Sequence, residues 1–269
     1  LKSVDVEVGK NSVINGGLGG SVKFETKEAK ELLMNNNRFG GRIQASYNNN
    51  SSTGFAISSY GQLTEQLDVL AYFNKVSRDN YTVGGEKILN SENQVIEGTD
   101  GKVRGLKGDL DDRLVKLGFD IDNKQRLSIG YEIYNDEGNY SYRPDMGLAT
   151  DLAIADSLGI PLTYPTEFSR DTLTLNYNID LDNTHLKFSL FENQSTLWRD
   201  ERGLETWYPP NAVINEGEAT NQGLNLLGTT NLANSKQQTL TYGIDIIQYD
   251  TQYIVDNIKQ ADESARHSS

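Results

Sequence analysis

The sequence has no cysteine and only two histidines among its 269 residues. The absence of cysteine excludes a disulfide-stabilised scaffold and any metal site built from thiolates. No run of about 18 apolar residues occurs, so no segment is suited to cross a membrane as a helix. The mean hydropathy of -0.58 is polar. It does not separate water-soluble proteins from membrane barrels, because only alternate residues of a barrel strand face lipid.

Basic residues are scarce relative to acidic ones, with 25 Lys and Arg against 38 Asp and Glu and a net charge of -13. Such a balance argues against a nucleic-acid partner, since neutralising phosphates needs clustered Lys and Arg. Tyrosine is frequent, with 14 residues against 8 Phe. This excess suits a membrane interface, where one end of the ring is apolar and the other wet, although ordinary β-propensity also accounts for it.

Alternation with period two is the dominant pattern, and it predicts strands with one apolar and one polar face. In segment 126–134, for example, one face carries the apolar residues Leu127, Ile129, Tyr131 and Ile133. Strands are predicted near 39–48, 53–62, 67–78, 112–122, 126–136, 168–180, 184–196 and 236–249. Several of these reach ten residues or more, whereas strands of soluble proteins average about five or six.

The predicted connections alternate between tight and long. The tight ones are 63–66, 123–125 and 181–183, and the long ones are 79–111, 137–167 and 197–235, the second with a helix predicted at 151–158. Three long loops are unusual in a compact soluble domain. Outer-membrane barrels have this asymmetry, with short periplasmic turns and long extracellular loops.

The first 38 residues differ from the rest. They contain a short strand at Val4, Val6 and Val8, a glycine cluster at 16–20, a strand at 21–26 and a helical turn at 28–33. Clustered glycines permit positive φ and close approach of chains.

Segment 15–33 resembles the plug-to-barrel junction of TonB-dependent outer-membrane receptors. Leu18, Gly19, Gly20, Thr26 and Lys27 match the family's small-residue motif and its closing Thr-Lys, and glycine replaces the usual alanine at position 17. Segments 142–147 and 161–177 are similar to iron-regulated FrpB-type receptors. The resemblance spans nearly the whole chain.

The resemblance implies an all-β fold: a partial transmembrane antiparallel barrel, about eight strands of a 22-stranded barrel, preceded by the last strand of a plug. It divides the chain into a plug end at 1–27, a connection at 28–38 and a barrel part at 39–269. It implies import of a ferric siderophore or haem into the periplasm, energised by the TonB–ExbB–ExbD complex through a segment expected before Leu1. Outer-membrane lipid and lipopolysaccharide are the other expected partners, and no resident cofactor or metal is expected.

Iron-complex uptake calls for aromatic stacking area and for arginines that attract anionic ligands. The predicted extracellular loops supply both, in the candidate ligand contacts Tyr140, Tyr142, Arg143, Tyr164, Trp198, Arg199, Arg202, Trp207 and Tyr208. The same residue types also form the aromatic girdle of barrels or contact lipopolysaccharide phosphates. The candidate junction residues are Gly16, Gly17, Gly19, Gly20, Thr26 and Lys27. Inward-facing polar residues are expected to bond the plug, namely Arg42, Gln44, Ser46, Thr172, Asn176 and Lys187.

Catalysis has little support. His185 follows a tight turn and His267 lies in a polar C-terminal run, and no catalytic or metal-ligand spacing surrounds either. Two other classes of protein remain open at this point. One is a non-energised porin or adhesin barrel, which leaves the junction motif unexplained. The other is a soluble carbohydrate-binding β-protein that uses Trp198 and Trp207 as stacking platforms.

Overall fold

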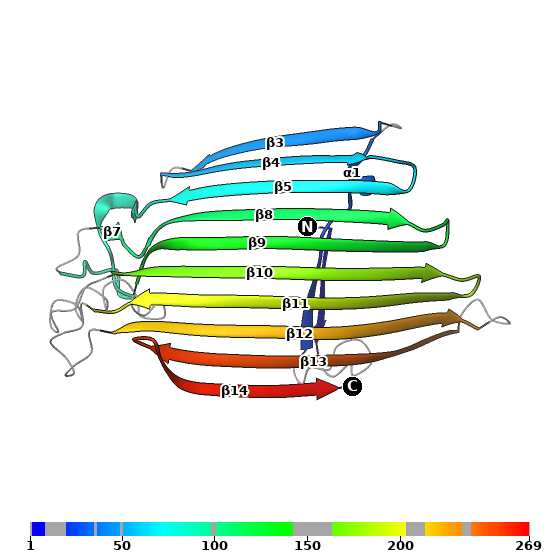
Figure 1. Ribbon diagram of the computed structural model, residues 1–269. Coiled ribbons are helices and arrows are strands. Elements are labelled where there is room, and N and C mark those ends of the chain that lie inside the picture. The colour runs from blue at the N-terminus through cyan, green and yellow to red at the C-terminus, as the bar shows by residue number, and fades with distance from the viewer. Residues whose placement is uncertain are drawn as a thin grey trace.

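The computed structural model describes residues 2–8, 20–34, 37–48, 51–97, 101–141, 163–202, 213–232 and 238–268. Its main element is one antiparallel sheet of ten strands, in which each strand pairs with its neighbours along the chain (Figure 1). The strands are β3 (Phe39–Asn48), β4 (Ser52–Gln62), β5 (Leu67–Arg78), β8 (Leu106–Asp120), β9 (Gln125–Ser141), β10 (Thr163–Asp180), β11 (Thr184–Asp200), β12 (Ile214–Asn231), β13 (Thr239–Val255) and β14 (Ile258–Ser268). This sheet is called the wall below, and β3 and β14 are its edges.

A separate antiparallel hairpin, β1 (Ser3–Val8) with β2 (Gly20–Glu25), lies across one face of the wall (Figure 1). The short helix α1 (Ala29–Leu32) connects this hairpin to the wall and packs over β4 and β5. Ala29 and Leu70 are buried where they meet, at 1% and 5% exposure. The face that carries the hairpin and α1 is called the inner face. Among the described residues, none of the helices is long and apolar enough to span a membrane.

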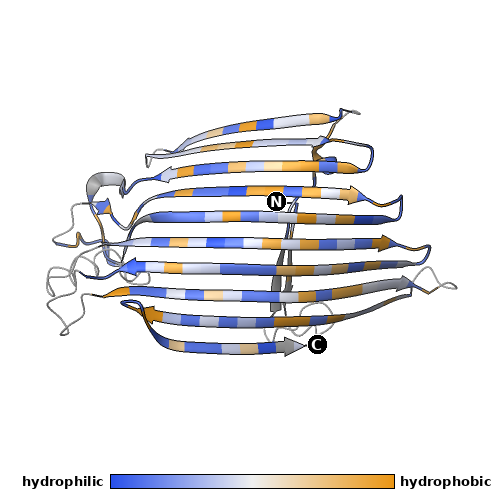
Figure 2. Cartoon of the chain, in the orientation of Figure 1, coloured by the Kyte–Doolittle hydropathy of each residue, from blue (hydrophilic) through white to orange (hydrophobic). Residues whose placement is uncertain are grey.

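The two faces follow from the alternation of side chains along each strand. On β8, Val115, Leu117 and Phe119 are 50%, 43% and 40% exposed on the outer face. Leu117 pairs with Ile129, which in turn pairs with Leu175, so the apolar residues form continuous rows across neighbouring strands. Figure 2 shows this alternation over the whole wall. Apolar rows of this extent indicate a face that contacts lipid.

The apolar rows cover only part of each strand. Strands β8 to β13 have 15 to 18 residues, roughly 50–60 Å of chain at about 3.3 Å per residue, whereas the lipid-facing band of an outer-membrane barrel is about 25 Å tall. On β8 the outer face turns polar at Arg113 and Asp111, and on β10 it turns polar at Asp171. This polar end, called the loop end, carries the connections 79–105, 142–162 and 201–213. The opposite end, called the turn end, carries 63–66, 121–124 and 181–183.

Two strands of the wall were not predicted from the sequence. The predicted long loop at 197–235 is wrong, because β12 occupies Ile214–Asn231, and the C-terminal polar run forms β14. Glu216, Glu218 and Thr220 lie on the outer face of β12 near the loop end, where polar residues on both faces hide the alternation that marks a strand. The predicted helix at 151–158 lies outside the described residues, whereas the predicted helical turn at 28–33 is confirmed as α1.

The predicted strict alternation of connection lengths is also wrong. The loop end has two tight turns, one before β4 and one at Asp256–Asn257 between β13 and β14. Asp256 and Asn257 have φ of 48° and 66°. Positive φ at both central residues is the requirement of a two-residue hairpin turn, and Asn and Asp tolerate it better than other side chains.

Candidate functional site

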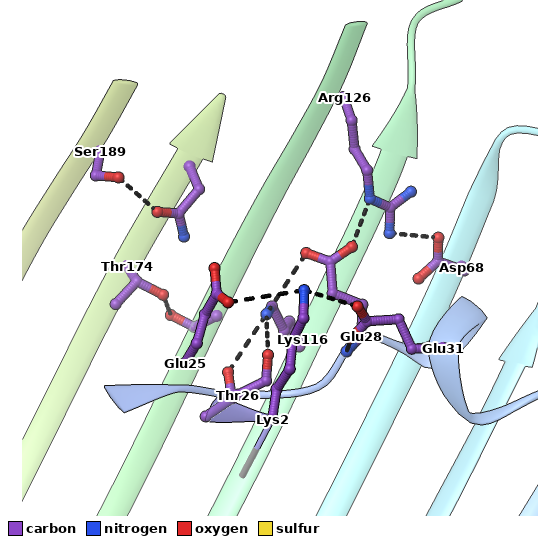
Figure 3. A network of polar contacts seen from close by, with 12 residues as sticks. Lys2, Glu25, Thr26, Glu28, Glu31, Asp68, Lys116, Arg126, Thr174 and Ser189 are labelled. Carbon is purple, nitrogen blue, oxygen red and sulfur yellow. Dashed lines mark hydrogen bonds and ion pairs between the residues drawn. The ribbon is translucent and has the colours of Figure 1, made fainter. Parts of the chain in front are cut away.

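The inner face contains a cluster of ion pairs where the β1–β2 hairpin meets the wall, shown in Figure 3. Arg126, at the start of β9, is its centre. Its Nε donates to Glu28 at 2.5 Å, its Nη1 to Asp120 at 2.7 Å and its Nη2 to Asp68 at 2.8 Å. Lys116 lies 3.5 Å from Glu28, and Lys30 pairs with Asp120. The residues Glu28, Lys30, Asp68, Lys116, Asp120 and Arg126 are called the junction cluster below.

The junction cluster joins four parts of the chain. Glu28 and Lys30 come from the connection after β2, whereas Asp68, Lys116, Asp120 and Arg126 come from β5, β8 and β9. Asp68 is only 2% exposed, so its charge depends on the Arg126 guanidinium for compensation. Lys116 also donates to the backbone oxygen and the hydroxyl of Thr26, both at 3.3 Å.

A second ion pair fastens the hairpin to α1. Lys2 Nζ lies 2.8 Å from Glu31 and 3.7 Å from Glu25. The hydrogen bond to Glu31 raises the pKa of Lys2. Burial acts to raise the pKa of Glu31, but hydrogen bonds from Lys2 and from the backbone at Glu28 outweigh it and lower this pKa. Both groups are therefore charged near neutral pH and hold the first strand against the connection.

Gly118 on β8 makes room for the Arg126 guanidinium. A Cβ at this position would collide with Nη2 of Arg126 and lie 2.9 Å from Asp68. We expect Gly118→Ala to destabilise the barrel by about 1–3 kcal/mol, because the guanidinium is held by three carboxylates and cannot move aside. Gly217→Ala is the matched control, since nothing lies within 4 Å of its Cβ. Thermal unfolding of the full-length receptor in detergent measures both, and equal stability of the two variants would contradict the expectation.

The predicted junction residues are partly described. Thr26 contacts Lys116 and Lys27 is exposed, while Gly20 begins β2. Gly16, Gly17 and Gly19 lie outside the described residues. Of the inward-facing polar residues, Lys187 lies 4.0 Å from Glu25 of the hairpin. Thr172 and Asn176 instead accept hydrogen bonds from Asn193 and Ser189 on β11.

A second cluster lies on the inner face near the loop end. Arg78 on β5 donates to the Tyr140 hydroxyl at 2.6 Å and pairs with Asp136, and its guanidinium carbon is 5.7 Å from the Tyr140 ring centroid. Tyr140 donates to Asp136, and Tyr134 donates to the other oxygen of the same carboxylate at 3.3 Å. Two phenols and one guanidinium thus converge on one carboxylate.

The cluster continues onto β10. The Arg170 guanidinium stacks on the Tyr134 ring at 5.2 Å and lies 3.3 Å from Glu132, and Phe168 meets the same ring edge-on at 5.9 Å. Within the described part of the chain, the buried Nε atoms of Arg78 and Arg170 have no hydrogen-bond partner. The residues Arg78, Glu132, Tyr134, Asp136, Tyr140 and Arg170 are called the loop-end cluster. It offers aromatic surface and guanidinium donors side by side.

Several predicted ligand contacts lie beside this cluster. Tyr140 belongs to it, and its partner in register on β10 is Tyr164, which is 1% exposed. Arg199 is also on the inner face, where it donates to Thr166 at 3.3 Å. Trp198 lies on the outer face of β11, and Arg202 follows the end of that strand, where it binds Asp200 at 2.5 Å. Tyr142, Arg143, Trp207 and Tyr208 lie outside the described residues.

Arg78, Tyr134, Asp136 and Arg170 were not predicted as site residues. Their position in the sequence could have identified them. Each lies an even number of residues from the inner-face polar residues of its own strand, and therefore on the same face. The strand predicted for Tyr134 and Asp136 ended at 136 and the one predicted for Arg170 began at 168, so these residues appeared as strand ends and not as one inner surface.

Comparison with known proteins supports this architecture. No family model matches the chain. The chain is 31% identical over 209 residues to the heme transporter BhuA of Brucella ovis, covering 75% of this chain and 27% of that protein. It is 26% identical over 136 residues to the hemoglobin and hemoglobin-haptoglobin-binding protein A of Haemophilus influenzae, covering 50% and 12%. The chain thus spans about a quarter of the length of the BhuA relatives.

Solved structures show the same fold. The FrpB iron transporter of Neisseria meningitidis matches with a TM-score of 0.73 at 20% identity, covering 94% of this chain and 36% of that one. The ferric enterobactin receptor PfeA of Pseudomonas aeruginosa matches with a TM-score of 0.64 at 15% identity, covering 98% and 40%. These relatives are receptors and transporters. The sequence and the fold together place the chain among the TonB-dependent outer-membrane receptors, and its ten strands form part of a barrel wall in the bacterial outer membrane.

Proposed function

We propose that the chain is part of a receptor that imports haem, or another iron complex, into the periplasm with energy supplied through TonB and its partners ExbB and ExbD. The observation that carries the proposal is the loop-end cluster, which places Arg78, Arg170 and two tyrosines on the inner face at the loop end. The heme transporters among the relatives make haem the first cargo to test.

The chemistry of the cluster fits such a cargo. Haem presents a flat aromatic ring and two carboxylates, and ferric siderophore complexes are commonly anionic and rich in aromatic rings. Tyrosine rings offer broad stacking area, and guanidinium groups bind carboxylates through paired donors. The guanidinium groups of Arg78 and Arg170 are donors of this kind, and their side chains are 33% and 35% exposed. Arg199 lies on the same inner face, whereas Tyr164 is 1% exposed and would support the surface without contacting the cargo. Tyr142, Arg143, Trp207 and Tyr208 are proposed to complete the surface from the loops.

We assign three parts to the chain within this receptor. Residues 1–27 are the end of a plug, 28–38 a connection, and 39–269 part of the barrel. The separate β1–β2 hairpin on the inner face supports the first assignment, and the run from α1 to the start of β3 supports the second. The junction cluster then fixes the end of the plug to the wall.

The proposal is tested by titrating the full-length receptor, purified in detergent, with haemin and separately with a ferric catecholate siderophore. We expect saturable haemin binding that Arg170→Met weakens about tenfold to hundredfold, since a charge-assisted hydrogen bond contributes about 1.5–3 kcal/mol. Arg113→Met is the matched control, because Arg113 lies on the outer face with its side chain 58% exposed.

The pattern of binding decides the cargo. Saturable binding of the siderophore alone would identify a ferric siderophore, and not haem, as the cargo. The proposed receptor class would be unchanged. Haemin affinity equal in Arg170→Met and Arg113→Met would remove the loop-end cluster from the binding site. Growth on haemin as the sole iron source, compared in strains with and without TonB, tests the energy source.

A further inference from the structure

The polarity of the two faces of the wall is reversed at the loop end. One row of partners in register on the inner face consists of Leu110, Asp136, Phe168, Leu197, Gly217 and Tyr253, and Asp136 is its only charged member. The neighbours of this row along the strands are acidic at several places on the outer face, at Asp109, Asp111, Glu167, Glu216 and Glu218. The membrane-spanning part of a barrel is apolar outside and polar inside. An apolar inner row beyond that part therefore indicates a contact made from within the barrel.

The row has a gap at Gly217. Leu197 and Tyr253 are the partners of Gly217 on its two sides, and both are 45% exposed. Within the part of the chain that the structure describes, nothing lies within 4 Å of a Cβ placed on Gly217. The place between Leu197 and Tyr253, with Gly217 as its floor, is called the Gly217 gap.

The width of the Gly217 gap suits a flat ring. Neighbouring strands lie about 4.8 Å apart, so the Cα atoms of Leu197 and Tyr253 flank a space about 10 Å wide. A flat ring that contacts carbon atoms on both sides at about 3.5–4.0 Å needs about 7–8 Å. The edge of one planar aromatic ring therefore fits between the two side chains, and a side chain at position 217 would occupy its place.

The Tyr253 ring is held in position beside the gap. Its hydroxyl donates to Asn215 at 2.7 Å, two residues from Gly217 on β12. This bond directs the ring toward β12 and does not bring it over Gly217. A ring fixed by its hydroxyl loses little conformational freedom when another ring stacks on its exposed face, which favours binding.

The Gly217 gap continues into the loop-end cluster. Leu197 pairs with Phe168, which meets the Tyr134 ring edge-on, and Arg170 stacks on that same ring. Apolar surface and a guanidinium thus follow one another along the inner face. A cargo with a flat apolar ring and carboxylates at its edge matches both, whereas a protein segment that merely covered the apolar row would not need the arginine.

We infer that the Gly217 gap is a second contact surface of the cargo site, which takes the edge of the haem ring while Arg170 binds one of its carboxylates. The inference rests on the proposed function, since it takes haem as the cargo. Leu197 and Tyr253 contact the two faces of the ring, and the iron has no part in this contact. The gap therefore selects for a planar macrocycle, with or without its metal.

The experiment titrates the full-length receptor in detergent with haemin and, separately, with iron-free protoporphyrin IX. Gly217→Leu is expected to weaken the binding of both porphyrins by the same factor, about tenfold or more, because leucine fills the gap. Glu218→Leu is the matched control, since it places the same side chain at the next residue, on the outer face. This control is expected to bind both porphyrins as the wild type does.

Tyr253 separates ring stacking from hydrogen bonding. Tyr253→Ala is expected to weaken porphyrin binding about tenfold through the loss of one stacked ring. Tyr253→Phe keeps the ring and is expected to bind nearly as the wild type does. An equal loss in both variants would assign the effect to the hydroxyl and overturn the stacking role.

The outcomes separate the inference from the proposed function. If Gly217→Leu binds haemin as Glu218→Leu does while Arg170→Met binds it weakly, the gap is not part of the site and haem import stands. A loss for haemin without a loss for protoporphyrin would also overturn the ring contact. If Gly217→Leu lowers the unfolding temperature of the unliganded receptor and leaves porphyrin affinity unchanged, the gap packs against another part of the receptor, and the inference fails. If the wild type binds neither porphyrin, the inference and haem as the cargo fail together.

Discussion

Replacing Arg126 with methionine is expected to destabilise the folded barrel by about 3–5 kcal/mol, because removing one partner of a buried ion pair leaves an uncompensated charge. Asp68 is 2% exposed and accepts from Arg126 at 2.8 Å, and Glu28 and Asp120 bind the same guanidinium. Methionine keeps an unbranched apolar stem in place of that of arginine, so the loss reflects mainly the missing guanidinium and its ion pairs.

Thermal unfolding of the full-length receptor, followed by its heat-dependent mobility on gels, measures this loss. Arg113→Met is the control, because its exposed pair with Asp111 contributes about 0–1 kcal/mol. Adding Asp68→Asn to Arg126→Met is expected to recover part of the stability, since it removes the stranded charge. Equal unfolding temperatures for Arg126→Met and Arg113→Met would show that the junction cluster does not hold the connection to the wall.

Replacing Ile129 with arginine is expected to cost about 2–4 kcal/mol of folding free energy, which is the cost of a lipid-facing cation near the bilayer midplane. Ile129 is 41% exposed on the outer face, in the apolar row with Leu117 and Leu175. The cost arises from burying a charge in hydrocarbon. It therefore depends on how deep in the bilayer the substituted residue lies, and not on which strand carries it.

Asn135→Arg is the control for Ile129→Arg. Asn135 lies on the same face of the same strand, closer to the loop end, where the outer residues are polar. The two variants are compared by urea unfolding of the full-length receptor in lipid vesicles, and the control is expected to unfold as the wild type does. A similar loss in both variants would place the membrane boundary beyond residue 135, which would refute the depth of the apolar band described above.

The strands with apolar outer rows were predicted from the sequence, but several of their loop-end bounds were not: the strand predicted at 126–136 runs on to Ser141, and the one predicted at 168–180 begins at Thr163. The segment predicted at 67–78 is β5, with the same bounds. Strand β12 was missed because Glu216, Glu218 and Thr220 make its outer face polar near the loop end. Sequence periodicity reveals a strand only where its inner and outer faces differ in hydropathy. This difference is lost where the strand extends beyond the membrane and both faces are polar.

The ion pairs between the hairpin and the wall were not predicted from the sequence. The motif ending in Thr26 and Lys27 marked the point where the hairpin meets the wall, whereas Glu28 and its partner Arg126 are 98 residues apart. The loop-end cluster shows the same limit, since Arg78 and Tyr140 are 62 positions apart. The register of at least three neighbouring strands decides such pairs, and the alternation within one strand does not reveal that register.

The pairing order of the wall has a consequence for how the barrel is assembled. Every strand of the sheet pairs with the next wall strand along the chain, so the wall can grow hairpin by hairpin. Each step closes either a tight turn or a single longer loop such as 79–105 or 142–162. Glu28 is different, because its partner Arg126 stands at the start of β9. The junction cluster can therefore form only when β5, β8 and β9 are in register, because Asp68, Asp120 and Arg126 come from these three strands. A slip of one residue in β9 would turn Arg126 to the outer face and away from Glu28. The Glu28–Arg126 pair can therefore form only after β9 has joined the wall in the correct register.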